Sequence, residues 1–475
     1  MEETLKHKAV KGVLWRILEV GAGQGISLVL SIILARLIMP DQFGLIAMLG
    51  IFFGITNVFV DSGFAQALIR KNNRTQIECS TVYWYNIGLS FILYILLFLC
   101  APFISYFYNE PLLTPLLRFT AIRIIIASFT GVHRTLLKAE MKFKLMTKFN
   151  LLSSFISGVV GITLAYLDFK VWALAWQDVI GACLSTIFLL NKVKWRPSLV
   201  FSLTSLKEFF GFGSKLLASS ILDIVYSNIT PIIIGKVYRA SDLAYYNRAY
   251  SLAGFTSSMP CGVLQSITYP TLCKIQDNES LLKDGYRRMI KLSAFIIFPM
   301  CIGMGAVAYP LINVVYSSVW IFAATLLSIV VFSMMWYPIH AINLNYLIVK
   351  GKSNLFFRLE IIKKIQGLAI LMITVPLGLE AMCWGGVAGS LLSLIWNTYY
   401  TGKFLKMGIL SQLRDIFPTI LLCAVMYAIS RTIANIMGND IISLVCSIAA
   451  GIVIFVGGAF LFRFPEIREL KNLKK

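Results

Sequence analysis

Fourteen apolar segments fill most of this 475-residue chain and leave only short polar connections between them. A transmembrane helix needs about 20 apolar residues, and each segment is about that long or longer. The chain is 58% hydrophobic and 14% charged, whereas a soluble domain carries roughly 25% charged residues. We therefore expect an all-α integral membrane protein with no room for a separate soluble catalytic domain. The expected spans are 13–38, 42–68, 80–104, 112–137, 146–167, 171–191, 214–237, 249–272, 290–315, 318–347, 361–379, 383–402, 416–436 and 441–462.

Other features of the composition argue against a metalloprotein, a cofactor enzyme or a processed leader. The nine cysteines form no CxxC pair and no Cys/His cluster, so we expect no metal site and no cofactor. The polar N-terminus, MEETLKHKAVKG, precedes an apolar segment that is too long for a cleaved signal peptide.

Lys and Arg are distributed unevenly between alternate connections. If both termini are cytoplasmic, the inward-facing segments hold 34 of the 43 basic residues and the outward-facing segments hold six. Cytoplasmic loops of membrane proteins carry this excess of positive charge, so the pattern supports both the span count and the orientation. The net charge of +21 then reflects loops that face anionic lipid rather than a nucleic-acid partner.

Two stretches about 200 residues apart resemble each other. ARLIMPDQFGLIAM from Ala35 and GKVYRASDLAYYNR from Gly235 place Arg36 and Lys236 at equivalent positions. Six spans separate the copies, so both enter the membrane from the same side, as in a parallel repeat around a central cavity. The expected domains are an N-terminal lobe (1–195), an amphipathic cytoplasmic linker (196–213), a C-terminal lobe (214–405) and an extra pair of spans with a basic tail (406–475).

Charged residues inside spans are costly and need a reason. Arg16 and Glu19 lie three residues apart on one face of the first span, and Asp61 lies at a similar depth in the second. Two interpretations stay open: a salt bridge that joins the two helices, or a cytoplasmic gate or ion site. Asp223, in the seventh span, joins Glu19 and Asp61 as a candidate for proton or sodium coupling.

Arg118 and Arg123 lie in the outer and middle parts of the fourth span, with no acidic neighbour in sequence. Five residues correspond to about 140° around a helix, so the two side chains cannot both face one cavity squarely. At least one is expected to face water or an anion such as phosphate, which a guanidinium binds with two parallel hydrogen bonds. The alternative is an ion pair with an acid on another helix. Arg248, at the outer end of the eighth span, is a further candidate for the cavity or for its rim.

Several motifs occur in an order and spacing typical of one family. They are KGVLWRILEVGAGQGISLVLSIILARLIMPDQFGLIAM, VDSGFAQALIRK, EFFGFGSKLLASS and SDLAYYNRAYSLAGF. Over essentially its whole length the chain resembles the polysaccharide-exporter branch of the multidrug/oligosaccharidyl-lipid/polysaccharide transporters. Within that branch it is most similar to the Wzx-type flippases.

The resemblance implies a flippase, not an enzyme, in the bacterial inner membrane. It would move undecaprenyl-pyrophosphate-linked oligosaccharide for O-antigen, capsule or exopolysaccharide by alternating access of a cationic cavity. By their charge and depth, Arg16, Arg118, Arg123 and Arg248 are the candidates for this cationic lining. Membrane lipids, H⁺ or Na⁺, a polysaccharide polymerase and glycosyltransferases are the further partners considered. A cation-coupled multidrug exporter and, with less support, a membrane polymerase or ligase are the alternatives.

Overall fold

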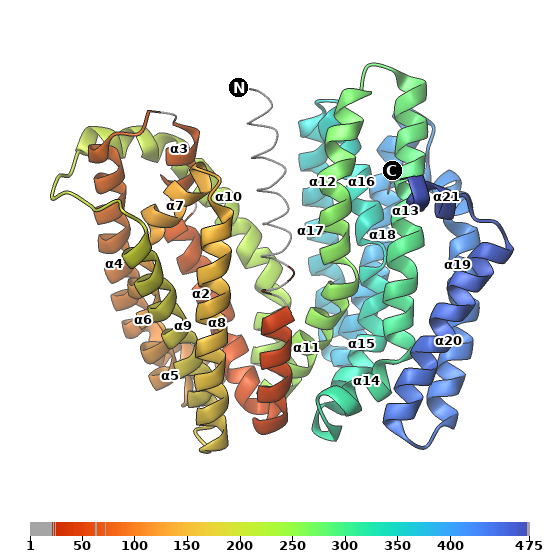
Figure 1. Ribbon diagram of the computed structural model, residues 1–475, viewed down its shortest axis with the longest axis horizontal. Coiled ribbons are helices and arrows are strands. Elements are labelled where there is room, and N and C mark those ends of the chain that lie inside the picture. Colours follow the sequence, from red (N-terminus) through yellow and green to blue (C-terminus); the bar gives the residue numbers. More distant parts are fainter. Residues whose placement is uncertain (1–20, 22, 24, 62–63, 72, 473–475) are drawn as a thin grey trace. The chain divides into compact units, whose positions relative to one another are not determined.

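The computed structural model describes residues 21, 23, 25–61, 64–71 and 73–472, and within these residues every regular element is a helix. The chain divides into two compact units, Met1–Ala244 and Tyr245–Lys475 (Figure 1). Each is a bundle of mostly long apolar helices, which confirms the prediction of an all-α membrane fold. The unit boundary lies within α11, so α10, expected as the first helix of the C-terminal lobe, packs in the first unit against α2 and α4.

The first unit begins, in its described part, with the helix Gly25–Leu37. The helices that follow are α2 (Pro40–Asp61), α3 (Phe64–Arg70), α4 (Gln76–Tyr108), α5 (Leu113–Thr120), α6 (Ile122–Ser128), α7 (Gly131–Ala139), α8 (Phe143–Tyr166), α9 (Val171–Lys192) and α10 (Leu203–Val237). Local sequence sets several of these ends: Thr75 and Glu78 form a reciprocal capping box at the start of α4, and Asn109 ends that helix in the left-handed conformation.

The second unit continues with α11 (Ala240–Thr256) and ends with the helical pair α19 and α20 followed by the short α21. Its other elements are α12 (Ser258–Lys274), α13 (Glu279–Ala306), α14 (Ala308–Val315), η1 (Ser318–Trp320), α15 (Ile321–Met334), α16 (Tyr337–Val349), α17 (Ser353–Thr374), η2 (Val375–Leu377), α18 (Leu379–Leu405), α19 (Ile409–Ile436), α20 (Asp440–Leu461) and α21 (Pro465–Asn472). Tyr286, Asn343, Thr401 and Gln412 are fully or almost fully buried and bond to one another between α13, α16, α18 and the start of α19. This network satisfies polar groups that would otherwise be costly to bury.

Ten helical segments of the described chain are long and apolar enough to cross a membrane, or eleven if the bent pair Leu113–Ser128 and Gly131–Ala139 counts as one. The three remaining predicted spans are helical but do not meet that standard. The first is described only from its later part, and the eighth is split at Ser257 into α11 and α12. The eleventh corresponds to α17, which carries four charged residues between Arg358 and Lys364.

The linker predicted as an amphipathic surface helix has a different form. Residues 193–202 are not helical, and α10 then runs without interruption from Leu203 into the seventh span. The non-helical part is tied to the start of α4, because Trp84 Nε1 donates to the Ser198 carbonyl at 2.9 Å and Gln76 Nε2 donates to the Arg196 carbonyl at 2.7 Å. The lobe boundaries given by the sequence repeat stay predictions.

The two turns that suggested the repeat have the same local form. One helix ends at Leu37 and the next begins at Pro40, while the equivalent helices end at Val237 and begin at Ala240. Gly44 and Ala240 lie so close that a Cβ atom at Gly44 would overlap the Ala240 carbonyl group. Glycine at position 44 therefore allows α2 to pack against the beginning of α11.

Candidate functional site

A cavity of about 990 Å³ lies inside the first unit. Its wall comes from the helix Gly25–Leu37, from α2 and from α6 to α9, with one residue, Thr120, at the end of α5. Its volume is at the upper end of the 300–1,000 Å³ that ligand pockets usually occupy. The polar residues of the wall are Ser27, Ser31, Asn57, Thr120, Arg123, Arg134, Asn150, Ser153, Ser154, Ser157, Gln177, Asp178 and Ser185.

Helical periodicity explains how apolar helices present this polar wall. In α8 the cavity residues are Asn150, Ser153, Ser154 and Ser157, which recur every three or four positions and so share one face. Residues 177, 178, 181, 182 and 185 repeat the pattern in α9. The close packing of α8 and α9 places the two polar faces together, while their other faces stay apolar.

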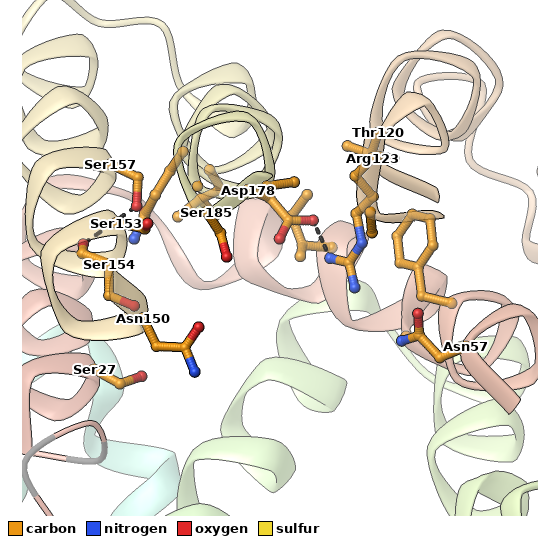
Figure 2. A pocket seen from close by; sticks show the side chains of 18 of the residues that line it. Ser27, Asn57, Thr120, Arg123, Asn150, Ser153, Ser154, Ser157, Asp178 and Ser185 are labelled. Carbon is orange, nitrogen blue, oxygen red and sulfur yellow. Dashed lines mark hydrogen bonds and ion pairs between the residues drawn. The ribbon is translucent and has the colours of Figure 1, made fainter. Parts of the chain in front are cut away.

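Arg123 supplies the first positive charge of the wall. Its Nη1 forms an ion pair with Asp178 Oδ2 of α9, and its guanidinium lies 4.5 Å from the ring centroid of Phe53 in α2. Figure 2 shows this pair on one side of the cavity and Asn150, with the serines of α8, on the other. A guanidinium held by an aromatic face and one carboxylate keeps donors available for a ligand, since it has five N–H groups.

Arg134 supplies the second positive charge. Its Nη2 donates to Ser185 Oγ at 2.8 Å, which joins α7 to α9. Among the described residues, the cavity wall thus holds two arginines and one aspartate, together with many hydroxyl and amide groups. Arginine forks suit phosphate oxygens, and hydroxyl and amide side chains match the donors and acceptors of a sugar.

The structure separates the two arginines of the fourth span, as their 140° spacing predicts. Arg118 is not part of the cavity wall: its Nε donates to the Phe98 carbonyl at 3.2 Å, and its guanidinium lies 4.2 Å from the Phe98 ring centroid. Its role in substrate binding stays a prediction. Arg123 lines the cavity and also forms an ion pair with an acid on another helix, Asp178 of α9. The two interpretations of Arg123 therefore both apply.

The other predicted site residues lie elsewhere. Arg16 and Glu19 fall outside the described residues, and so does the side chain of Asp61, the last residue of α2. Asp223 is exposed on α10 and is not part of the cavity wall. Arg248 belongs to the second unit, where its guanidinium lies 4.9 Å and 5.1 Å from the ring centroids of Tyr316 and Trp320.

Sequence reasoning missed Asp178, Arg134 and most of the uncharged wall. Arg134 falls near the end of the predicted span 112–137 and lies in α7, the second helix of the bent pair. The sequence does contain a pattern that predicts the uncharged wall: polar and small residues recur at helical spacing in segments 150–161 and 177–185. A search confined to charged residues does not detect such faces.

Comparison with known proteins identifies the family and the fold. Residues 33–325 match the family described as a polysaccharide biosynthesis protein. The teichuronic acid biosynthesis protein TuaB of Bacillus subtilis is 25% identical over 83% of this chain and 83% of its own length. The lipopolysaccharide biosynthesis protein WzxC of Escherichia coli is 25% identical over 67% of this chain and 65% of its own length.

Solved structures with a similar fold are membrane proteins. The lipid II flippase MurJ, in an inward closed conformation, aligns with a TM-score of 0.75 and 15% identity over 95% of this chain and 99% of its own. An inward-facing multidrug resistance transporter of the MATE family aligns with a TM-score of 0.62 and 16% identity over 80% of this chain and 94% of its own. Since the family match covers more than half of its length, this multi-pass membrane chain belongs to the polysaccharide biosynthesis protein family.

Proposed function

We propose that this chain is a flippase that moves undecaprenyl-pyrophosphate-linked oligosaccharide across the bacterial inner membrane. The observation that carries the proposal is Arg123, held in a cavity whose wall is otherwise rich in hydroxyl and amide groups. The biosynthetic names of TuaB and WzxC and the fold shared with MurJ support the same class of substrate. The product would serve O-antigen, capsule or exopolysaccharide synthesis.

The physical task explains why such a cavity is needed. Burying the charge and hydroxyl groups of a pyrophosphate–sugar head group in hydrocarbon would cost on the order of tens of kcal/mol in the Born limit. A polar cavity that opens to one side at a time removes most of this barrier, while the prenyl tail stays in lipid. Arg123 and Arg134 would bind the phosphates, and the serine and asparagine side chains of α8 would bind the sugar.

The residues predicted from sequence keep their roles within this proposal. Arg16, Arg118 and Arg248 are candidate contacts for the head group at other stages of transport. Glu19, Asp61 and Asp223 are candidate sites for H⁺ or Na⁺, and Asp178 joins them because it lies in the cavity wall. A polysaccharide polymerase and glycosyltransferases would act after and before the transport step.

A cation-coupled multidrug exporter is the second candidate. Asp178 favours it, because a carboxylate in the cavity suits a cationic drug, and the MATE transporter shares the fold. In the described part of the cavity wall, two arginines against one aspartate favour the anionic substrate. Expression in a drug-sensitive strain distinguishes the two: the flippase proposal predicts no change in the minimal inhibitory concentration of cationic dyes.

The central test is complementation of a flippase-deficient strain. We expect the wild-type chain to restore surface polysaccharide and Arg123→Ala to fail, with equal amounts of both proteins in the membrane. Lys148→Gln is the matched control, because Lys148 is an exposed cation on α8 outside the cavity wall. Normal polysaccharide from Arg123→Ala would contradict the assignment of Arg123.

The orientation needs its own test. We propose that both termini are cytoplasmic, supported by the excess of Lys and Arg in alternate connections. A fluorescent protein fused after Lys475 should fold and fluoresce, and alkaline phosphatase inserted after Lys170 should be active. The reverse pattern would contradict the orientation.

A further inference from the structure

A second pocket, of about 480 Å³, lies in the second unit between the start of α13 and the turn from α18 to α19. Four basic residues line it, Lys283, Arg287, Lys406 and Arg414, with Asp415 as the one acid. In the proposed orientation this pocket faces the cytoplasm. It shares no residue with the cavity of the first unit.

The internal ion pairs leave most of this positive charge uncompensated. Arg287 binds Asp415 through two hydrogen bonds, one of them from Nε at 2.6 Å, and Lys291 Nζ lies 3.7 Å from the same carboxylate. The Asp415 side chain is only 3% exposed. Within the described chain, no carboxylate lies within 4.0 Å of the charged groups of Lys283, Lys406 or Arg414.

The backbone supplies two more features that suit an anion. Gly408 is the N-cap residue of α19 and supplies no side-chain cap, so the first-turn N–H groups of this 28-residue helix lack a capping side chain from that residue. Leu410 and Ser411 of this first turn line the pocket. Lys406 adopts the left-handed conformation, with φ of 55°, which a lysine adopts only at a cost. A glycine would fit this position more easily, yet the chain places a cation there.

An apolar groove adjoins the basic pocket. It has a volume of about 430 Å³, and most of its wall is apolar, with Leu422 and Val425 of α19 and Phe464 between α20 and α21. Its charged members are Lys291, Asp415 and Glu466. Asp415 lines both the groove and the basic pocket. A ligand with an anionic head and a hydrocarbon chain would therefore contact both sites at once.

We propose that these two pockets form a binding site for an anionic membrane phospholipid. The phosphate lies against Lys283, Lys406 and Arg414, and one acyl chain lies in the groove beside Val425. Basic pockets between transmembrane helices on the cytoplasmic side are typical places for such lipids. The adjoining groove favours a lipid over a free phosphate ion.

Native mass spectrometry of the full chain in neutral detergent, titrated with phosphatidylglycerol, tests this site. Phosphatidylcholine with the same acyl chains is the neutral comparison. Each basic side chain near a membrane surface contributes roughly fivefold to binding. The triple variant Lys283→Gln, Lys406→Asn, Arg414→Gln should therefore bind phosphatidylglycerol about 100-fold more weakly, and asparagine keeps the left-handed turn accessible.

The matched control removes three exposed cations of the first unit, Lys192→Gln, Lys194→Gln and Lys207→Gln. It changes the net charge equally and should keep the wild-type affinity. Equal losses in the two triple variants would overturn the proposal, because binding would then follow total charge.

Two further experiments distinguish a bound lipid from a bound phosphate ion. Val425→Trp fills the groove without changing any charge, and it should weaken phosphatidylglycerol binding while the protein keeps its melting temperature. Inorganic phosphate at millimolar concentration should not displace the lipid. Unchanged lipid affinity in Val425→Trp, or displacement by phosphate, would overturn the lipid as occupant.

Discussion

Arg123 on α6 and Asp178 on α9 form an ion pair in the wall of the first unit's cavity, 55 residues apart in sequence. The pair does more than join two helices, because Arg123 also lies against the face of Phe53. The Arg123–Asp178 pair determines the local charge that a ligand would encounter in this part of the cavity wall. Both side chains are partly exposed, so the pair is open to competition from a second anion.

The pair gives a test that separates binding from support of the fold. Loss of a hydrogen bond from a charged group costs about 1.5–3 kcal/mol, so Arg123→Ala should lower transport roughly 10- to 100-fold. If Arg123 only neutralised Asp178, the double variant Arg123→Ala, Asp178→Asn would restore activity, because no unpaired charge would remain. We expect the double variant to stay as impaired as Arg123→Ala. Polysaccharide export, normalised to protein in the membrane, is the measurement, and restored export would assign Arg123 to structure.

Arg134 gives a second prediction for the cavity. Arg134→Gln should lower export by about tenfold, since it removes one positive charge from the wall and its bond to Ser185. Arg134→Lys should recover part of the activity, because it restores the charge without the planar fork. Ser185→Ala serves as the control for the bond alone, and we expect it to keep most of the activity. Equal losses in Ser185→Ala and Arg134→Gln would show that the bond, not the charge, matters.

Hydropathy and charge predict much of this fold and little of its cavity. Each predicted span is mostly helical where the chain is described, because an apolar segment in lipid must satisfy its backbone groups internally. The positions at which helices break or bend were less predictable from the sequence. The helix break at Ser257 lies close to Pro260, a residue type that favours a bend in a helix. The bend of 47° between α6 and α7 has no proline at its break.

Partners across the bundle could not be predicted, since they depend on helix rotation and packing. The sequence placed Arg123 near mid-membrane, but nothing in one sequence associates it with Asp178. Arg118 is likewise a charged residue within an apolar span, yet its guanidinium lies against the ring of Phe98 and not in the cavity wall. A search for polar faces at helical spacing would have found Ser153 and Ser157 and so α8 as a cavity helix.

The close approach of Gly44 to Ala240 predicts a loss of stability on a small change. Gly44→Ala would force the new Cβ against a backbone carbonyl, which cannot rotate away as a side chain can. Such overpacking costs about 1–3 kcal/mol. We expect a lower melting temperature for the detergent-solubilised protein, measured by fluorescence-detected size-exclusion chromatography after heating. Gly88→Ala is the control: Gly88 is exposed in α4, its Cβ would meet open space, and alanine should stabilise the helix by about 0.5–1 kcal/mol.

Glu110, in the turn between α4 and α5, gives a prediction about pH. Partial burial, and then the negative charge of Asp41, raise the pKa of the Glu110 carboxyl above its usual value. The native state thus takes up a proton at a higher pH than the unfolded chain, so this residue costs stability above its native pKa. That cost disappears as the pH falls below the unfolded value, about 4.3. Glu110→Gln should therefore raise the melting temperature at pH 7.5 and have little effect near pH 4. Asp277→Asn, at an exposed position, is the comparison, and a gain from Glu110→Gln that is equal at both pH values would refute the electrostatic cause.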